Sequence, residues 1–485
     1  MPETNVQTNE AGTGKAPAKD AAGRLGVEPV GRLLLHFSIP AITGMMVQAL
    51  YNLVDRVFIG NAVDEMALGG ISLVMPLMTI SFAFAMLFGM GAANMISMRL
   101  GQGRKQDAEN TLAHCFFLLL GTGILLMVFG LIFLEPLLSL LGAEEGSAAL
   151  DYARRYFRIT LYSAVFGLLG FGFSHCTRAQ GFPIVTMFAL LVGAVLNVIF
   201  DALFILVFGW GIEGAAWATF VAQSASMIWV VGFSMGRRPV VRLKLKTFRP
   251  SFSVVMQIAS FGSAQFLFQI MMSIVQLLFN MSMIWYGVEA LGLENGADIA
   301  LAGMSIVGAV QMIILMPVFG IMQGAQPLLG YNYGAKKYSR VLRAYMIATV
   351  AGTIVCTVGF AVAMLFPEQL VKIFSPDGEP ALMAFSARTM RIMFLVLPVV
   401  AFVVISTTFF VVTGRPKTSI FLSMVRQCII IIPLLLIFGK IWGLWGAVYA
   451  APVSDALSFL IVGVMIFFEL RKLRSAGGEV HGEAH

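Results

Sequence analysis

Twelve apolar runs, with short polar segments between them, follow one another along the chain. They cover residues 36–59, 68–97, 113–134, 157–178, 184–208, 213–235, 253–286, 299–328, 344–366, 388–412, 419–438 and 443–468. Each run is near or above the roughly 20 residues that an α-helix needs to cross a bilayer. The pattern therefore predicts an all-α polytopic membrane protein with twelve transmembrane helices.

The second half of the chain repeats the first. The segment ALGGISLVMPLM at Ala67 returns as ALAGMSIVGAVQ at Ala300, an offset of 233 residues. The same offset relates Gly101 to Gly334, Arg155 to Arg388, Arg158 to Arg391, and the loop Q-G-F-P to T-G-R-P. Six helices per half is an even number, so both halves enter the membrane from the same side and form parallel repeats. Substrate sites in such folds lie between the repeats, within the membrane.

The repeat divides the chain into five expected segments. Residues 1–31 lack an apolar stretch and are rich in Ala, Gly, Lys, Glu and Thr, so we expect a disordered tail rather than a signal peptide. Helices 1–6 form an N-lobe over 32–236 and helices 7–12 form a C-lobe over 251–470. The basic stretch 237–250 links them, and 471–485 is a second tail.

Charged residues sort between alternate loops. Basic residues gather in one set of connections: Arg99, Arg104 and Lys105; Arg178; Arg237, Arg238, Arg242, Lys244, Lys246 and Arg249; Lys336, Lys337, Arg340 and Arg343; Arg415 and Lys417. The other set is mainly acidic, with Lys372 and Lys440 as its few bases. By the positive-inside rule the basic loops, both tails and the linker are expected in the cytoplasm.

Composition agrees with a membrane protein and removes other classes. The chain of 485 residues is 59% hydrophobic and 12% charged, and its mean hydropathy is +0.87. Its net charge of +7 lies in loops, so it indicates orientation rather than nucleic-acid binding. Four cysteines lie in apolar runs without metal-ligand spacing, which predicts neither disulfides nor a zinc site.

Two polar side chains interrupt the apolar run LLVGAVLNVIFDALFILVF. Asn197 and Asp201 are the strongly polar residues among its nineteen. A charge at the centre of a membrane helix costs from roughly 2.5 to over 10 kcal/mol, so such residues are usually functional. Their i, i+4 spacing places both on one helical face, about 6 Å apart. One proton or small cation can therefore contact both.

Further polar residues fall at a similar depth. Counted from the outer helix ends, Asp55, Asp201 and Thr219 lie roughly 6 to 11 Å below the outer surface. Asn197 lies one turn deeper, and Tyr51 shares a face with Asp55. The repeat places Leu434 opposite Asp201 and Gln276 near the position of Asp55, so this charge chemistry is confined to one lobe.

Each candidate has a structural alternative. Asp55 could pair with Arg56 at the outer interface, although adjacent helical residues point about 100° apart. Asp455 in helix 12 fits a packing role and a functional role equally well. The repeated arginines are better explained as long side chains that extend to the interface: Arg155, Arg158, Arg388 and Arg391.

Helix 7 carries a neutral polar stripe. Gln265, Gln269, Gln276 and Asn280 follow one another at steps of 4, 7 and 4. The stripe either lines a substrate cavity or joins helices. Methionines nearby would suit an adaptable surface for varied apolar ligands: Met271, Met272, Met304, Met312 and Met316.

These residues together resemble the multidrug and toxic compound extrusion (MATE) family over about 32–470. The resemblance rests on a proline, Pro40, fifteen residues before Asp55, on Y-N-L-V-D-R in helix 1, on N-x-x-x-D in helix 5, and on Thr219 in helix 6. It implies V-shaped lobes and a monomer in a bacterial cell membrane that exports organic, often cationic, drugs in exchange for H⁺ or Na⁺, with no other cofactor. It implies a cation site at Asp55, Asn197, Asp201, Thr219 and Tyr51, and a bend at Pro40. A cation site in the C-lobe is not expected, because helix 10 has no acid.

Other functions fit less well. A lipid-linked saccharide flippase related to this family should place several bases in the central cavity, whereas Arg426 is the clearest base within a span. An intramembrane prenyltransferase needs further acids where Val198 and Ile205 stand. A major-facilitator transporter needs the motif G-x-x-x-D-R, which RLGQGRKQD lacks. We therefore expect an efflux transporter, not an enzyme.

Overall fold

The structure is a computed structural model, and it describes residues 21–62, 65–141, 147–245, 248–376 and 379–482. The N-terminal half contains α1 (Ala21–Arg24), α2 (Val30–Ala62), α3 (Glu65–Ala85), the π-helix η2 (Met86–Met90), α4 (Gly91–Gly101), α5 (Lys105–Ile132), α6 (Leu134–Leu140), α7 (Ala148–Ala179), α8 (Pro183–Asp201), the π-helix η3 (Ala202–Val207) and α9 (Gly211–Met235).

The C-terminal half repeats this order of long helices. It contains α10 (Phe252–Leu291), α11 (Gly296–Gly334), α12 (Tyr338–Leu365), α13 (Pro367–Phe374), α14 (Pro380–Met393), the 3₁₀ turn η5 (Phe394–Val396), α15 (Leu397–Val412), α16 (Pro416–Met424), the π-helix η6 (Val425–Ile430) and α17 (Ile431–Gly482). A short helix follows the third long span in both halves, as α6 and α13, which supports the repeat inferred from sequence.

The predicted twelve spans are present, although the last two are continuous. Within the described residues, eleven helices are long and apolar enough to cross a membrane, and the last covers 60 residues. A straight helix of that length would measure about 90 Å, three bilayer cores. Gly443 breaks it at φ 57° and ψ −137°. Past this break the chain packs back on itself: a Cβ at Gly446 would lie against the carbonyl oxygen of Phe438, eight residues earlier.

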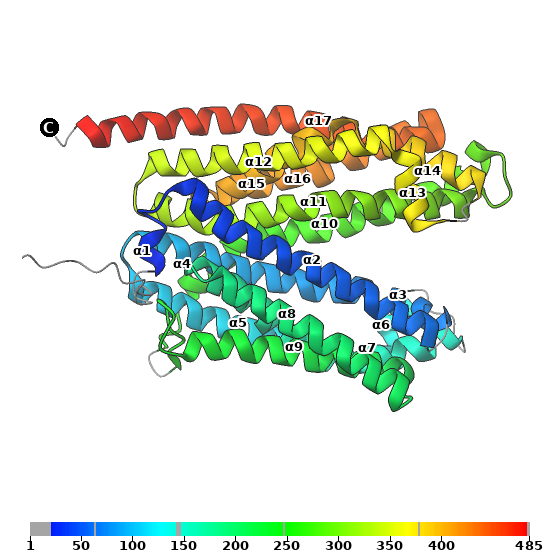
Figure 1. The fold of residues 1–485 in the computed structure, drawn as a ribbon, viewed down its shortest axis with the longest axis horizontal. Helices are drawn as coiled ribbons and strands as arrows, with labels where there is room; N and C mark the ends of the chain where they lie inside the picture. Colours follow the sequence, from blue (N-terminus) through cyan, green and yellow to red (C-terminus); the bar gives the residue numbers. More distant parts are fainter. Residues whose placement is uncertain (1–20, 63–64, 142–146, 246–247, 377–378, 483–485) are drawn as a thin grey trace, which may run out of the picture.

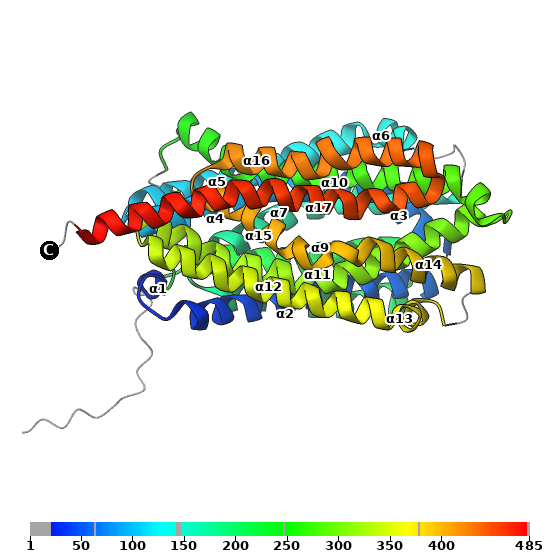
Figure 2. The same cartoon turned by 90° about the horizontal axis from the view of Figure 1, so that it is seen from above.

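The long helices lie roughly parallel in one bundle (Figure 1). Those of the N-terminal half, from blue to green, fill one side, and those of the C-terminal half fill the other. The view from above shows the same long bundle, with α13 and α14 at one end (Figure 2). α2 crosses between the halves and packs against both α11 and α8. α10 packs against α3 and α4 in the same way.

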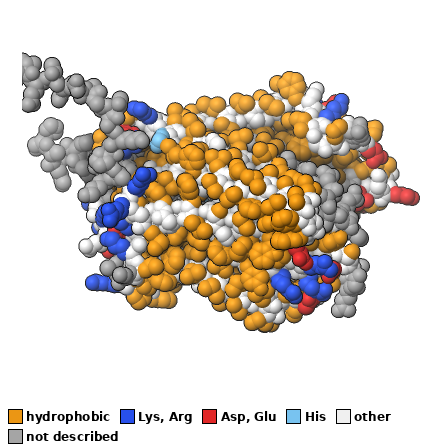
Figure 3. Space-filling view, turned by 60° about the horizontal axis from the view of Figure 1, so that its bottom comes forward, with side chains coloured by type: hydrophobic (Ala, Val, Ile, Leu, Met, Phe, Trp, Pro, Cys, Tyr) orange, Lys and Arg blue, Asp and Glu red, His pale blue; other side chains and the backbone are white. Residues whose placement is uncertain are grey.

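The flanks of the bundle are apolar and its ends are charged. Hydrophobic side chains cover most of the flank in the space-filling view (Figure 3). Lys and Arg gather at one end and most acidic side chains at the other. The first, here called the basic end, carries the loops of Arg104, Arg237 and Lys336. This distribution identifies a multi-pass protein whose flank contacts lipid.

Near the basic end the two halves pack backbone against backbone. A Cβ at Gly101 would lie against the carbonyl oxygen of Tyr331, and one at Gly334 against that of Met98. Both pairs obey the 233-residue offset, so α4 and α11 contact each other about the repeat axis. Glycine is required on both sides because any side chain would separate the helices.

The prediction of a disordered tail is wrong for residues 21–31. Leu25 is 1% exposed and Val30 4% exposed. The segment is held by the beginning of α12: Nη2 of Arg340 donates to the carbonyl oxygens of Leu25 and Glu28 at 3.1 and 2.6 Å. Composition missed this order because the segment supplies mainly backbone acceptors, which every residue carries. Residues 1–20 lie outside the described residues.

Candidate ion and substrate site

Asp201 is the last residue of α8, where the backbone changes to the π-helix η3. Single π-turns within α-helices occur often at functional sites. The side chain of Asp201 is 0% exposed and that of Asn197, one turn earlier, is 1% exposed. The structure therefore places both on the inward face of α8, as their spacing predicts.

The other candidates converge on this face. α2 packs against α8, and Asp55 of α2 lies close enough to Asp201 for their charges to interact. Tyr51, one turn before Asp55, lies within electrostatic range of both carboxylates. The alternative partner of Asp55, the side chain of Arg56, lies outside the described residues. Two like charges in so buried a setting are unfavourable until a proton or a cation neutralises one of them.

The polar atoms of α8 retain unused hydrogen-bonding capacity. Among the described residues, no N–H group donates to the carboxylate of Asp201, and neither Oδ1 nor Nδ2 of Asn197 has a partner. Buried polar groups in proteins are nearly always paired. Three oxygens without donors suit a proton or a small hard cation such as Na⁺, which takes oxygen ligands.

A cavity of about 430 Å³ opens beside these residues in the N-terminal half. Tyr51, Asn197 and Thr219 form part of its wall, so three of the five predicted site residues face it. Phe82, Phe157 and Phe171 supply aromatic surface. The volume lies within the range of small-molecule sites, which are mainly apolar with a few polar groups. Asp55 and Asp201 lie behind this wall rather than on it.

The predicted substrate residues of helix 7 are only partly placed here. Gln269 of α10 lines the cavity and is its contribution from the C-terminal half. Gln276 instead donates through Nε2 to Oδ1 of Asn280 at 3.0 Å, on an exposed face. Gln265 and Met271 are half-buried. Neither is among the residues that line the cavity, and neither takes part in the hydrogen bond between Gln276 and Asn280. Met272 and Met312 are exposed, at 49% and 61%.

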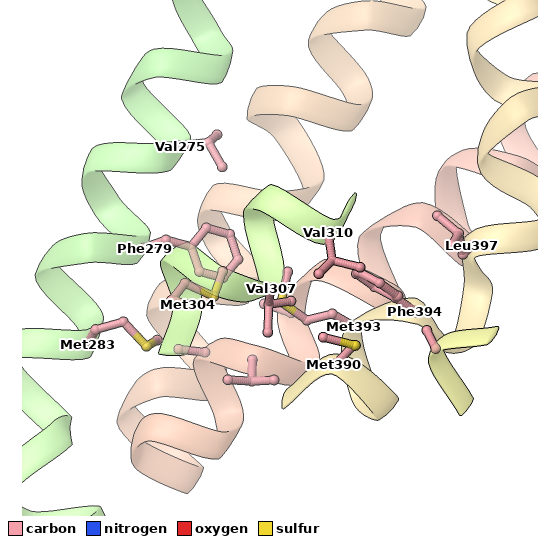
Figure 4. Packing of buried hydrophobic residues seen from close by; sticks show 14 of the residues in the cluster. Val275, Phe279, Met283, Met304, Val307, Val310, Met390, Met393, Phe394 and Leu397 are labelled. Atoms are coloured by element: carbon pink, nitrogen blue, oxygen red, sulfur yellow. The ribbon is translucent and has the colours of Figure 1, made fainter. Parts of the chain in front are cut away.

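For Met304 the predicted cavity role is wrong. It is 8% exposed and belongs to the hydrophobic core of the C-terminal half, among Val275, Phe279 and Val307. Figure 4 shows its side chain beside Phe279 and Val307, between α10 and α11. Residue type and helix membership could not separate these cases, because they do not say what each helix face contacts.

The structure adds site residues that sequence reasoning missed. Gln48 lines the cavity one turn before Tyr51, and Gln223 and Ser226 line it beyond Thr219. Their spacings were visible: 48, 51 and 55, like 219, 223 and 226, follow steps of 3 and 4 on one helical face. Tyr156 of α7, 4% exposed, lies within electrostatic range of Asp55 and Asp201. No sequence signal distinguishes it.

Asp455 has a structural partner. Nε of Arg426 lies 2.8 Å from its Oδ1, and the two side chains are 17% and 15% exposed. The pairing favours the packing alternative for Asp455. Two of the four outer arginines also have partners: Arg155 pairs with Asp151 at 2.8 Å, and Arg388 lies 3.9 Å over the ring of Trp445.

This largely buried pair of Arg426 and Asp455 gives a stability prediction. Arg426→Met should destabilise the protein by about 3–5 kcal/mol, because it leaves Asp455 charged and unpaired in an apolar setting. The double variant Arg426→Met, Asp455→Leu should recover most of that loss. Thermal unfolding of both variants in one detergent measures the difference. A double variant no more stable than Arg426→Met would contradict this explanation.

The chain is similar to known proteins over most of its length. The MatE family profile matches residues 40–203 and 265–437, which is most of the chain. The chain belongs to the MatE family. One of the two matched segments lies in each half of the bundle. The multidrug export protein MepA of Staphylococcus aureus strain MSSA476 is 25% identical to this chain over 441 residues. The match covers 90% of this chain and 94% of that protein.

Solved MatE structures share the fold. A transporter of the MOP superfamily from Pyrococcus furiosus superposes with a TM-score of 0.86 at 23% identity, over 95% of this chain and all of that one. A MATE crystal structure in the bent conformation gives 0.86 at 22% identity, over 94% and 99%. The twelve-helix fold and the family resemblance are thereby confirmed. MatE proteins are transporters, so the chain is a transporter rather than an enzyme.

Proposed function

We propose that this MatE protein is a multidrug efflux antiporter, which exports organic, often cationic, compounds in exchange for H⁺ or Na⁺. One observation carries the proposal: the buried carboxylate of Asp201 and the half-buried carboxylate of Asp55 lie close together, each one helical turn from a residue that lines a drug-sized cavity. A negative charge at this position attracts a cation bound in the cavity, and a small ion can neutralise that charge. The relatives named as multidrug exporters support the class of substrate.

The cavity suits an organic cation. Its aromatic side chains offer π-faces that attract a positive charge, and its polar groups are neutral amides and hydroxyls such as Gln48, Thr160 and Gln269. A negative charge on Asp55 or Asp201, one helical turn from the wall residues Tyr51 and Asn197, adds attraction at short range. Flexible substrates of different shape fit because most of the wall is apolar and makes no directional demand.

Exchange follows from competition for the acidic pair. Outside the cell, a proton or Na⁺ loads Asp55 and Asp201 and removes the charge that held the cationic drug. Inside, release of the ion restores the charge and drug can bind again. The cycle requires that the ion bind the two conformations with different affinities, because a ligand that binds both equally shifts nothing. By the positive-inside rule, the basic end faces the cytoplasm of a bacterial cell.

A lipid-linked saccharide flippase is the second candidate, and the cavity argues against it. No Lys or Arg is among the described residues that line the wall, whereas an anionic lipid headgroup needs bases. The distinguishing experiment is transport of a cationic dye into proteoliposomes under separate Na⁺ and pH gradients. We expect dye movement against its own gradient with one of the two ions. No transport under either gradient would contradict the proposal.

Pro40 is the candidate bend of α2. The helix begins at Val30, so Pro40 lies ten residues inside it rather than at its start. Proline removes one backbone hydrogen bond of a helix interior, at the carbonyl of His36. Pro40 also lies where α2 packs closely on α11, since a Cβ at Gly320 would contact Ile42 and one at Gly324 would contact Ser38.

A substitution at this position tests the bend. Pro40→Ala should slow transport several-fold while leaving equilibrium drug affinity unchanged, because it stiffens α2 without touching the cavity. Dye efflux and fluorescence-monitored dye binding, measured on the same preparation, provide the two quantities. Lost binding together with normal turnover would place Pro40 in the site instead.

A further inference from the structure

Arg178 is buried between the two halves at the basic end of the bundle, far along α7 from Tyr156. It lies in the last turn of α7 and is 5% exposed. Its Nη1 donates a hydrogen bond to Oε1 of Gln323, on α11 of the other half. A cavity of about 10 Å³ borders the guanidinium. This cavity is separate from the one beside Asp201.

The charge of Arg178 has no carboxylate partner among the described residues. The cavity is lined by Asn94, Ser97, His175, Gln323 and Gln326, with no acid among them. None of the ion pairs found in the described part of the chain includes Arg178. A buried guanidinium with only neutral neighbours is costly, and buried charges in proteins are normally paired.

Two fully buried polar atoms of the cavity lining have no partner in the described structure, and both are donors. Nε2 of Gln326 donates to Oδ1 of Asn94 at 2.7 Å, so the acceptor of Asn94 is taken and its Nδ2 has no partner in the described structure. Nε of Arg178 likewise has none. Ser97 already donates to the carbonyl oxygen of Asn94 at 3.0 Å. Two buried donors, one of them charged, need an acceptor.

The size and charge of the site select that acceptor. A volume of about 10 Å³ holds roughly one water molecule or one monatomic ion little larger than water, so phosphate and carboxylates are too large. Water would satisfy the donors but would leave the positive charge uncompensated. A monatomic anion does both. We propose that a halide ion, chloride under physiological conditions, binds Arg178 and Asn94 at this interface.

The position of the site gives the anion a consequence for conformation. Asn94 and Arg178 come from α4 and α7 of one half, and Gln323 and Gln326 from α11 of the other. The cavity is complete only while the halves are in contact at the basic end. An anion that binds this arrangement alone stabilises it over any arrangement in which α4 and α11 separate. Halide thus favours closure of the basic end.

Bromide tests the proposal, because it scatters anomalously and resembles chloride. The full-length protein is purified at constant Na⁺ and ionic strength, with gluconate replaced stepwise by bromide. We expect a saturable rise in Tm, a bromide anomalous peak beside Arg178 in crystals, and slower hydrogen exchange in residues 94–101 and 323–334. No saturable effect, or a cavity holding density without anomalous signal, would overturn the site.

Two variants make the result specific. Asn94→Asp keeps the shape of the side chain and supplies a fixed negative charge beside the guanidinium, so it should fold and lose the bromide-dependent rise in Tm. Arg99→Gln is the control: Arg99 also joins the halves at this end, through Nη2 to Oε1 of Gln257 at 3.0 Å, but it lies outside the cavity. It should keep the bromide effect. An unchanged bromide response in Asn94→Asp would contradict the proposal.

Discussion

No ion-driven efflux is expected from the Asp201→Asn protein, although it should fold and insert normally. The asparagine side chain keeps the volume of the aspartate in its fully buried site on α8. What it loses is the ability to alternate between holding a proton or Na⁺ and releasing it, since only an ionisable group can do so. Removing a charge that is expensive to bury should also raise Tm rather than lower it.

Dye efflux from proteoliposomes measures this prediction, with Tm and gel-filtration profile as checks on folding. Glu213→Gln is the matched control, because Glu213 is an acid of the same half but lies in the first turn of α9, away from the cavity wall. It should transport at the wild-type rate. Efflux at that rate in Asp201→Asn would remove this residue from the mechanism.

The Asp55→Asn, Asp201→Asn double variant should bind drug with an affinity that no longer depends on pH or Na⁺. In the wild type, drug affinity should fall as pH drops or as Na⁺ rises, because either ion neutralises the pair behind the cavity wall. With both charges removed, neither ion has a group to load. A cationic drug should then bind weakly at every pH, while a neutral drug is little affected.

Titration of fluorescent drug binding in detergent, over a series of pH values and Na⁺ concentrations, measures this change. The single variants provide the control for coupling, because titrations of two neighbouring acids belong to the pair rather than to either residue. If the double variant kept the full ion dependence, the coupling would lie elsewhere, and Asp455 with its partner Arg426 would be the next candidate.

The sequence predicted most of the fold because the bilayer imposes strict rules on it. Apolar runs of the required length located the spans, and the 233-residue offset predicted two similar halves. Depth along each helix predicts that Asp55, Asp201 and Thr219 lie at one level in the membrane. These inferences use the rise per residue and the membrane thickness alone, and both are nearly constant.

Inferences about what each helix face contacts were less successful. Gln269 belongs to the predicted polar stripe and Met304 to the methionines near it, yet Gln269 lines the cavity and Met304 is in the core. The isolated Arg178 was counted as a loop charge, and the structure buries it between the halves. Such outcomes depend on the packing of helices that are distant in sequence, which periodicity does not encode. The break at Gly443 depends likewise on a single backbone conformation.

Release of a cation when drug binds tests the central claim most directly. Affinity coupling is reciprocal, so a drug that competes with the ion for Asp55 and Asp201 must displace it. Purified protein in weakly buffered solution, or preloaded with ²²Na⁺, is mixed with saturating cationic drug. The account predicts release of protons or of ²²Na⁺ from the wild type and none from the Asp55→Asn, Asp201→Asn protein. Drug binding to the wild type without release of either cation would contradict it.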